Sequence, residues 1–180
     1  MEPKELFPQP ISIRGERAYT FDAPPRPGTA IPDFFLPDRD FRDRGRADFA
    51  GKPFVLAAFP TLETETGARE LSALGALAAE TGCPVVAVTN DTPFALRRFA
   101  APEGVTLLSA FRSPEFGMDF GCLVVEHRTM GLLARIALAA DAEGKIIAGG
   151  LSPELSDLPD LAPLAAALAQ NGDCISPPLP

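Results

Sequence analysis

The chain has 180 residues, a formal net charge of −8, and a composition that is 46% hydrophobic and 22% charged. This length suffices for one domain with a sizeable core, and the composition is that of an ordinary globular protein. The negative charge argues against nucleic acid or an anionic membrane as a partner. The sequence shows neither the run of roughly 20 apolar residues that spans a bilayer nor the apolar stretch of a signal peptide, so we expect a cytoplasmic location.

The first 40 residues contain eight prolines, which indicates an extended or looped chain rather than a helix. Within them, residues 11–21 (ISIRGERAYTF) alternate apolar and polar side chains around an Arg-Gly-Glu tripeptide and predict a small β-hairpin. The densely charged stretch 38–48 is predicted to be a solvated loop. Residues 127–128, a His-Arg pair, are predicted to be exposed in a loop.

From residue 54 onward, short apolar runs alternate with helical patterns. Strands are predicted at 54–59, 84–89, 105–108, 122–126, 134–140 and 145–148, and helices at about 64–80, 93–101, 114–120 and 158–170. The early alternation favours parallel strands with right-handed crossovers, whereas the turn at 141–144 favours an antiparallel pair near the end. We therefore predict an α/β fold with a mixed central sheet flanked by helices.

Three cysteines and one histidine limit the chemistry that the chain could carry. They are Cys83, Cys122, Cys174 and His127. An odd number of cysteines without a CxxC motif or a Cys/His cluster indicates neither a disulfide framework nor a zinc site. A Ser-His-Asp triad would need His127 as its base, and no GxSxG motif accompanies it. We therefore expect neither a metal nor a cofactor.

The most informative stretch is FPTLETETGARELSAL, at 59–74, where the first buried strand meets its helix. Pro60 opens the turn, Thr64 and Thr66 are good cap residues, and the neighbouring glutamates suit the positive end of a helix. A strand, a turn and a helix N-terminus in this order are also typical of a catalytic loop that presents a nucleophile. Gly67 stands where we would look for that nucleophile.

Three segments resemble the thiol peroxidase branch of the peroxiredoxins: FAGKPFVLAAFPTLET, TNDTPFALRRFAAPEG and MGLLARIALAADAEGKI. The resemblance runs from about residue 30 to 170, and the N-terminal hairpin is also similar to one found in that branch. It implies a Pro-rich N-terminal segment with the hairpin at 1–28, a thioredoxin-like redoxin domain at 29–170 and a C-terminal tail at 171–180. It also implies a homodimer, with thioredoxin as a partner if the protein is an active enzyme.

The resemblance also implies which positions would carry peroxide chemistry. The peroxidatic cysteine follows the pattern Pro, three residues, Thr or Ser, two residues, Cys; Pro60 and Thr64 match, and Gly67 occupies the cysteine position. An arginine after a Gly-Leu pair is matched by Arg135. In this atypical 2-Cys type the resolving cysteine belongs to the short helix after the second strand, where Ala100 stands.

Both redox cysteines of the family that this sequence resembles are thus replaced here. Thr64 and Arg135 can orient and polarise a peroxide but cannot replace a thiolate. We expect a peroxiredoxin homologue without thioredoxin-dependent hydroperoxide reductase activity, acting as a binding or regulatory protein. The alternative is an antioxidant enzyme that uses a non-standard cysteine, with Cys174 as first choice, since Cys83 falls at the far end of the helix and Cys122 in a predicted core strand.

Two questions about the site remain open from the sequence. Thr64 could serve only as a helix cap. Arg135 could form a structural salt bridge, with Glu63 or Glu65 as its partner, because an unpaired buried charge is very costly. It could instead form, with the helix N-terminus, a vestigial site for a small anion, in the space that Gly67 leaves empty.

Overall fold

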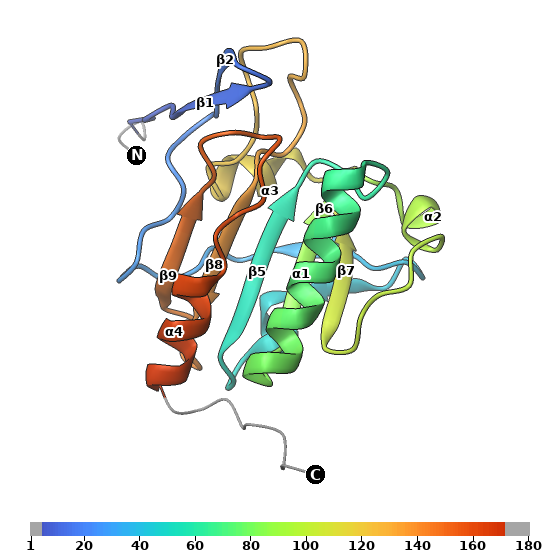
Figure 1. The fold of residues 1–180 in the computed structure, drawn as a ribbon, viewed down its shortest axis with the longest axis vertical. Coiled ribbons are helices and arrows are strands. Elements are labelled where there is room, and N and C mark those ends of the chain that lie inside the picture. Colours follow the sequence, from blue (N-terminus) through green and yellow to red (C-terminus); the bar gives the residue numbers. More distant parts are fainter. Residues whose placement is uncertain (1–4, 172–180) are drawn as a thin grey trace.

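The computed structural model describes residues 5–171 of the chain. Its centre is a five-stranded sheet in the order β7-β6-β5-β8-β9 (Figure 1). The strands are β5 (Phe54–Phe59), β6 (Val85–Thr89), β7 (Val105–Ser109), β8 (Ile136–Ala140) and β9 (Ile146–Leu151). The strands β5, β6 and β7 are parallel, β8 runs antiparallel to β5, and β9 runs antiparallel to β8. The predicted mixed sheet is therefore confirmed.

The sheet has a hydrophobic core on each of its faces. Successive side chains of a strand point to opposite faces, so Val55 and Ala57 of β5 belong to one core, whereas Leu56 and Ala58 belong to the other. Every residue of β5 is buried because both faces are covered. This double burial explains why the strand sequences are continuously apolar rather than alternating.

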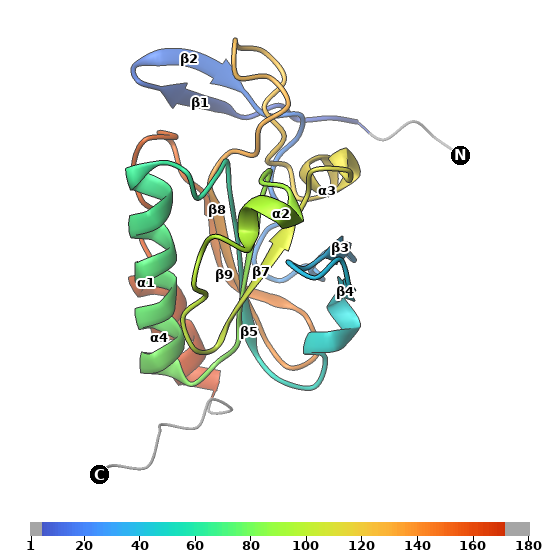
Figure 2. The same ribbon diagram turned by 90° about the vertical axis from the view of Figure 1, so that its right-hand side faces the viewer.

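The helices cover the sheet unevenly (Figure 2). They are α1 (Glu65–Thr81), α2 (Pro93–Leu96), α3 (Pro114–Asp119) and α4 (Ala162–Asn171). The two long helices, α1 and α4, lie on one face, and α3 lies on the other (Figure 2). The helix predicted at 93–101 is shorter, because α2 ends at Leu96. None of the helices within residues 5–171 is long and apolar enough to cross a bilayer.

Small elements precede the sheet: β1 (Pro10–Ile13), β2 (Glu16–Tyr19), β3 (Phe35–Pro37), β4 (Asp43–Gly45) and the 3-10 helix η1 (Arg46–Phe49). The antiparallel pair β1–β2 is the predicted hairpin. The prediction of a solvated loop at 38–48 is wrong, because β3 and β4 also pair. Asp38 closes this second hairpin, since its Oδ1 accepts the N–H groups of Asp40 at 2.8 Å and Arg42 at 3.0 Å.

The strand predicted at 122–126 is not formed. Leu123 makes only an isolated bridge to Leu133, and Val124 makes one to Thr20. The N–H groups of Cys122 and Leu123 instead donate to the carbonyl of Gly117, at 2.8 and 2.9 Å, which closes the end of α3. Backbone donors that satisfy a helix end cannot also serve a strand ladder.

Glu154, in the segment after β9, fastens the N-terminal hairpin to the domain. Its carboxylate accepts the hydroxyl of Ser12 at 2.5 Å and the N–H groups of Arg14 at 3.0 Å and Ser156 at 2.9 Å. Burial alone would raise the pKa of Glu154, but these hydrogen bonds outweigh that effect and lower it to about 2. The hairpin is thereby held at the end of the sheet where β5 leads into α1 (Figure 2).

Candidate functional site

The turn between β5 and α1 contains two of the residues predicted for the site. Pro60 is buried at the end of β5, and Thr64 is the N-cap residue of α1. The Oγ1 atom of Thr64 accepts the N–H of Gly67 at 3.0 Å, so Thr64 does act as a cap. Its hydroxyl hydrogen is still available for donation, since a hydroxyl can accept and donate at the same time.

Arg135 comes directly before β8 and is 3% exposed. Its Nη1 donates to Oε2 of Glu70, and its Nε donates to the carbonyl oxygen of Leu155 at 2.6 Å. The question left open by the sequence is thus answered in favour of a glutamate partner. The prediction that this partner is Glu63 or Glu65 is wrong.

The helical face of α1 explains this choice of partner. Glu70 is fully buried and lies three residues after Gly67 and four before Leu74, so all three share the inward face. Glu63 precedes the helix and pairs at the surface with Arg98 at 2.9 Å. The apolar spacing along α1 would have identified Glu70 as an inward-facing carboxylate that needs a buried cation.

The Glu70–Arg135 pair compensates the buried charge inside the protein. Burial lowers the pKa of Arg135 to about 10, so the guanidinium remains charged at neutral pH. It also lies 5.7 Å from the ring centroid of Phe59, a cation–π distance. Because Arg135 already has a carboxylate partner, an external anion would have to compete with Glu70 for it.

A cavity of about 450 Å³ borders the turn. Pro60, Thr64 and Arg135 all line it, so the three residues that the sequence singled out do come together. The N-terminal hairpin and the loop at 127–129 also line it.

The prediction that residues 127–128 are an exposed pair in a loop is only half right. Arg128 is exposed, as expected, but the side chain of His127 is only 8% exposed. The Nε2 atom of His127 lies 3.2 Å from Glu16 Oε2, and Nδ1 accepts the N–H of Thr129 at 3.2 Å. Hydrogen bonds from Arg128 and then His127 lower the pKa of Glu16. No local sequence signal identifies Glu16, because it lies 111 residues away from His127.

Gly67 lies in the first turn of α1 and is buried. A β-carbon at this position would collide with the carbonyl oxygen of Thr61 and would lie 3.0 Å from its carbonyl carbon and 3.2 Å from the Cα of Leu62. The expectation that Gly67 leaves an empty space is therefore wrong. The backbone of the turn has closed into the volume that a side chain would take.

Asp91, just after β6, holds this turn in position. Its Oδ1 accepts the hydroxyl of Thr61 at 2.6 Å, and its Oδ2 accepts the N–H of Leu62 at 2.8 Å and the hydroxyl of Thr89 at 3.0 Å. In the sequence, Asp91 stands just before the helix predicted at 93–101, and no site role was predicted for it. The signal that could have found it is its place after a parallel strand, because the carboxyl ends of β5 and β6 lie at the same edge of the sheet.

The position that the resemblance assigns to a resolving cysteine lies after α2. Ala100 is exposed there. The same segment approaches the turn, because its Arg98 forms the ion pair with Glu63. Ala100 has no polar atom in its side chain, so it can contribute no proton donor, acceptor or nucleophile.

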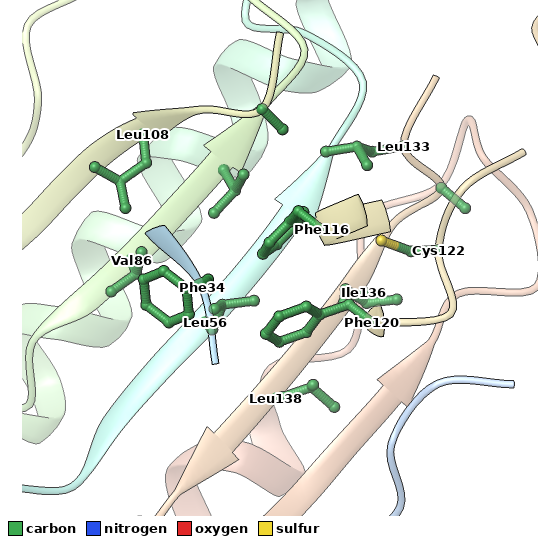
Figure 3. Close-up of a cluster of buried hydrophobic side chains, with 14 of the residues drawn as sticks. Phe34, Leu56, Val86, Leu108, Phe116, Phe120, Cys122, Leu133, Ile136 and Leu138 are labelled. Atoms are coloured by element: carbon green, nitrogen blue, oxygen red, sulfur yellow. The ribbon is translucent and has the colours of Figure 1, made fainter. Parts of the chain in front are cut away.

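The remaining cysteines differ in their surroundings. Cys122 is fully buried in the core with Phe116 and Ile136 (Figure 3), and burial raises the pKa of its thiol. A buried thiol of this kind is a poor nucleophile. Cys83 is buried just beyond the far end of α1 and is disulfide-bonded, which the odd number of cysteines did not indicate. Cys174 lies outside the described residues.

Within residues 5–171, no group of three or more His, Cys, Asp or Glu side chains is arranged to hold a metal ion.

Comparisons with known proteins agree on one family. The profile of the AhpC/TSA family matches residues 27–148 of the chain. The thiol peroxidase of Mycobacterium tuberculosis is 34% identical over 161 residues, which cover 88% of this chain and 97% of the relative. That of Vibrio cholerae is 34% identical over 155 residues, which cover 84% and 90%.

Solved structures show the same fold. A thiol peroxidase from Chromobacterium violaceum superposes with a TM-score of 0.83 at 21% identity, covering 93% of this chain and 98% of its own. A peroxiredoxin-like protein from Aquifex aeolicus gives 0.83 at 23% identity, covering 92% and 99%. The predicted thioredoxin-like fold, with a mixed five-stranded sheet and an N-terminal hairpin, is confirmed. By its profile match and by its identity to these relatives, the chain belongs to the AhpC/TSA family of peroxiredoxins and is a homologue of the bacterial thiol peroxidases.

Proposed function

We propose that this thiol peroxidase homologue does not reduce hydroperoxides and serves instead as a binding or regulatory protein. The observation that carries the proposal is the closed turn at Gly67, the position that the family resemblance assigns to the peroxidatic cysteine. The position has no sulfur, and the Thr61 carbonyl collides with any β-carbon placed there. Ala100 stands at the resolving position.

The chemistry explains why the neighbouring residues do not compensate. Peroxide reduction begins when a thiolate attacks one oxygen, forming a sulfur–oxygen bond as the oxygen–oxygen bond breaks and an alkoxide or hydroxide leaves. A helix N-terminus and a nearby arginine promote this by stabilising the thiolate and the leaving group. Thr64 and Arg135 supply that kind of environment, but neither can accept the oxygen atom.

The experiment follows the loss of hydrogen peroxide and of cumene hydroperoxide with dithiothreitol or thioredoxin as reductant. The thiol peroxidase of Mycobacterium tuberculosis, assayed alongside, provides the reference, and the iodoacetamide-treated chain provides the blank. We expect the untreated chain to match the blank. A turnover comparable to the reference, abolished by alkylation, would show that a sulfur outside the assigned positions does the chemistry.

The alternative function, an antioxidant enzyme that uses Cys174, is separated by one variant. Cys174→Ser would abolish any alkylation-sensitive turnover if that thiol is the nucleophile. A turnover that survives this substitution but is still abolished by alkylation would point to Cys83, because the reductant of the assay can open its disulfide while Cys122 stays buried. A surviving turnover that alkylation does not affect would point to contaminating activity. We regard the alternative as second because Cys174 lies outside the described residues, whereas the closed turn at Gly67 lies within them.

The cavity beside the turn supports the binding role, since about 450 Å³ is a volume typical of small-molecule sites. The pairing of Arg135 with Glu70 argues against the small anion that the sequence left open. We expect sulfate and acetate to raise the melting temperature of the parent no more than that of Thr64→Ala, at equal ionic strength. A larger increment in the parent would restore the anion hypothesis.

A further inference from the structure

The turn between β5 and α1 is held at several points. Leu62 is 1% exposed and packs into the core on the α1 face of the sheet. The carbonyl of Pro60 accepts the N–H of Asn90 at 3.1 Å. Asp91 adds its bonds to the hydroxyl of Thr61 and the N–H of Leu62. Side-chain packing, backbone bonding and a carboxylate thus restrain three consecutive residues, 60–62.

Asp91 is itself fixed to the sheet. Its carboxylate accepts the hydroxyl of Thr89, the last residue of β6, and its carbonyl accepts the hydroxyl of Ser109, the last residue of β7. Both hydroxyl-bearing residues are fully buried. The network therefore runs from two strand ends through Asp91 to the turn, and a shift of the turn would leave several polar groups without partners.

We infer that Asp91 is a positioning residue that locks the turn closed against Gly67, and that the lock requires glycine at this position. A flexible side chain in the way of a new β-carbon could rotate aside. Here the obstacle is the Thr61 carbonyl, which is backbone and is held on both sides by the bonds of the turn. In an ordinary helix alanine is more favourable than glycine, and the lock reverses that preference.

This inference goes beyond the proposed function, because it says that the folded turn has no room for any side chain at position 67. It implies that Gly67→Cys alone does not yield an unstrained thiol in the helix start. A sulfur there would fit only if the turn were released as well. The inference concerns conformation, so it stands or falls independently of the peroxide assay on the parent.

The test is a double-mutant cycle on the unfolding equilibrium of the full chain, with Gly67→Ala, Asp91→Ala and their combination. We expect Gly67→Ala to raise the unfolding constant by about tenfold, as overpacking does. We expect the same substitution to cost at least about threefold less when Asp91→Ala has freed the turn. Gly150→Ala is the matched control, because a β-carbon at Gly150 meets nothing within 4 Å.

Two results would overturn the inference. One is a Gly67→Ala variant that is as stable as the parent or more stable. The other is a double variant whose change in unfolding constant equals the product of the changes in the two single variants. If Gly67→Ala does not fold, hydrogen exchange on Asp91→Ala decides. The Leu62 amide should exchange at least about tenfold faster than in the parent, while the Ala68 amide, bonded within α1 to Thr64, stays unchanged. An unaltered Leu62 rate would show that Asp91 does not hold the turn.

Discussion

Arg135 and Glu70 form an ion pair that joins the start of β8 to the inward face of α1. Both side chains are almost fully removed from solvent, at 3% and 0% exposure. The two elements that build the candidate site are therefore tied together by opposite charges rather than by apolar contact alone. Such a pair is sensitive to the removal of one partner, because the other is then left as an uncompensated buried charge.

Glu70→Ala is expected to lower the free energy of unfolding by about 3–5 kcal/mol, since it leaves the Arg135 guanidinium buried without a carboxylate. Glu80→Ala, an exposed substitution on the same helix, should change it by about 0.5 kcal/mol or less. Combining Glu70→Met with Arg135→Met should recover most of the loss. Urea denaturation measures all three variants. A loss below about 1 kcal/mol for Glu70→Ala would contradict a buried ion pair.

We expect the attachment of the N-terminal hairpin to weaken in acid, because it depends on the Glu154 carboxylate. Its pKa falls from about 4.5 to about 2 on folding, so its stabilising contribution is complete above about pH 4.5. That contribution is lost as the pH falls from about 4.5 towards 2, because protonation removes the acceptor of the Ser12 and backbone bonds. Glu154→Gln should flatten the stability profile in this window, whereas the exposed Glu143→Gln should not. Parallel profiles for parent and Glu154→Gln would refute the attribution.

The start of α1 is expected to keep one conformation in oxidant and in reductant. A redox cycle that joins positions 67 and 100 would have to unwind this helix start, and Gly67 and Ala100 have no sulfur to join. Hydrogen-exchange maps of residues 60–70 in hydrogen peroxide and in dithiothreitol should therefore coincide. A large redox-dependent difference there would mean that another thiol acts on the turn.

A homodimer without an interchain disulfide is the assembly that the family resemblance predicts. Sedimentation in reductant should give twice the chain mass of 19.0 kDa. The same experiment without reductant controls for cross-linking through Cys174 in air. A monomer at micromolar concentration in both conditions would exclude this assembly.

Much of the fold follows from local pattern. The apolar runs at 54–59 and 84–89 predicted two central strands, and Thr64 with the leucine spacing beyond it predicted α1 within one residue at each end. The stretch at 38–48 was mispredicted, because its charges suggested solvation while Asp38 was in fact closing a hairpin. The composition of a segment indicates whether it is exposed to solvent. Its conformation can depend on a single carboxylate that accepts hydrogen bonds from backbone N–H groups.

The α/β class, the positions of the main strands and helices, and the residues at the turn could be predicted from the sequence, since they depend on periodicity and caps within short windows. The folded chain was needed to show that Arg135 pairs with Glu70, that Glu16 meets His127, and that the Thr61 carbonyl fills the space beside Gly67. These contacts join segments far apart in sequence or depend on how closely a turn packs onto its helix. Their outcome is set by the packing of the whole domain, because a buried charge or carbonyl takes the partner that the folded chain brings within reach.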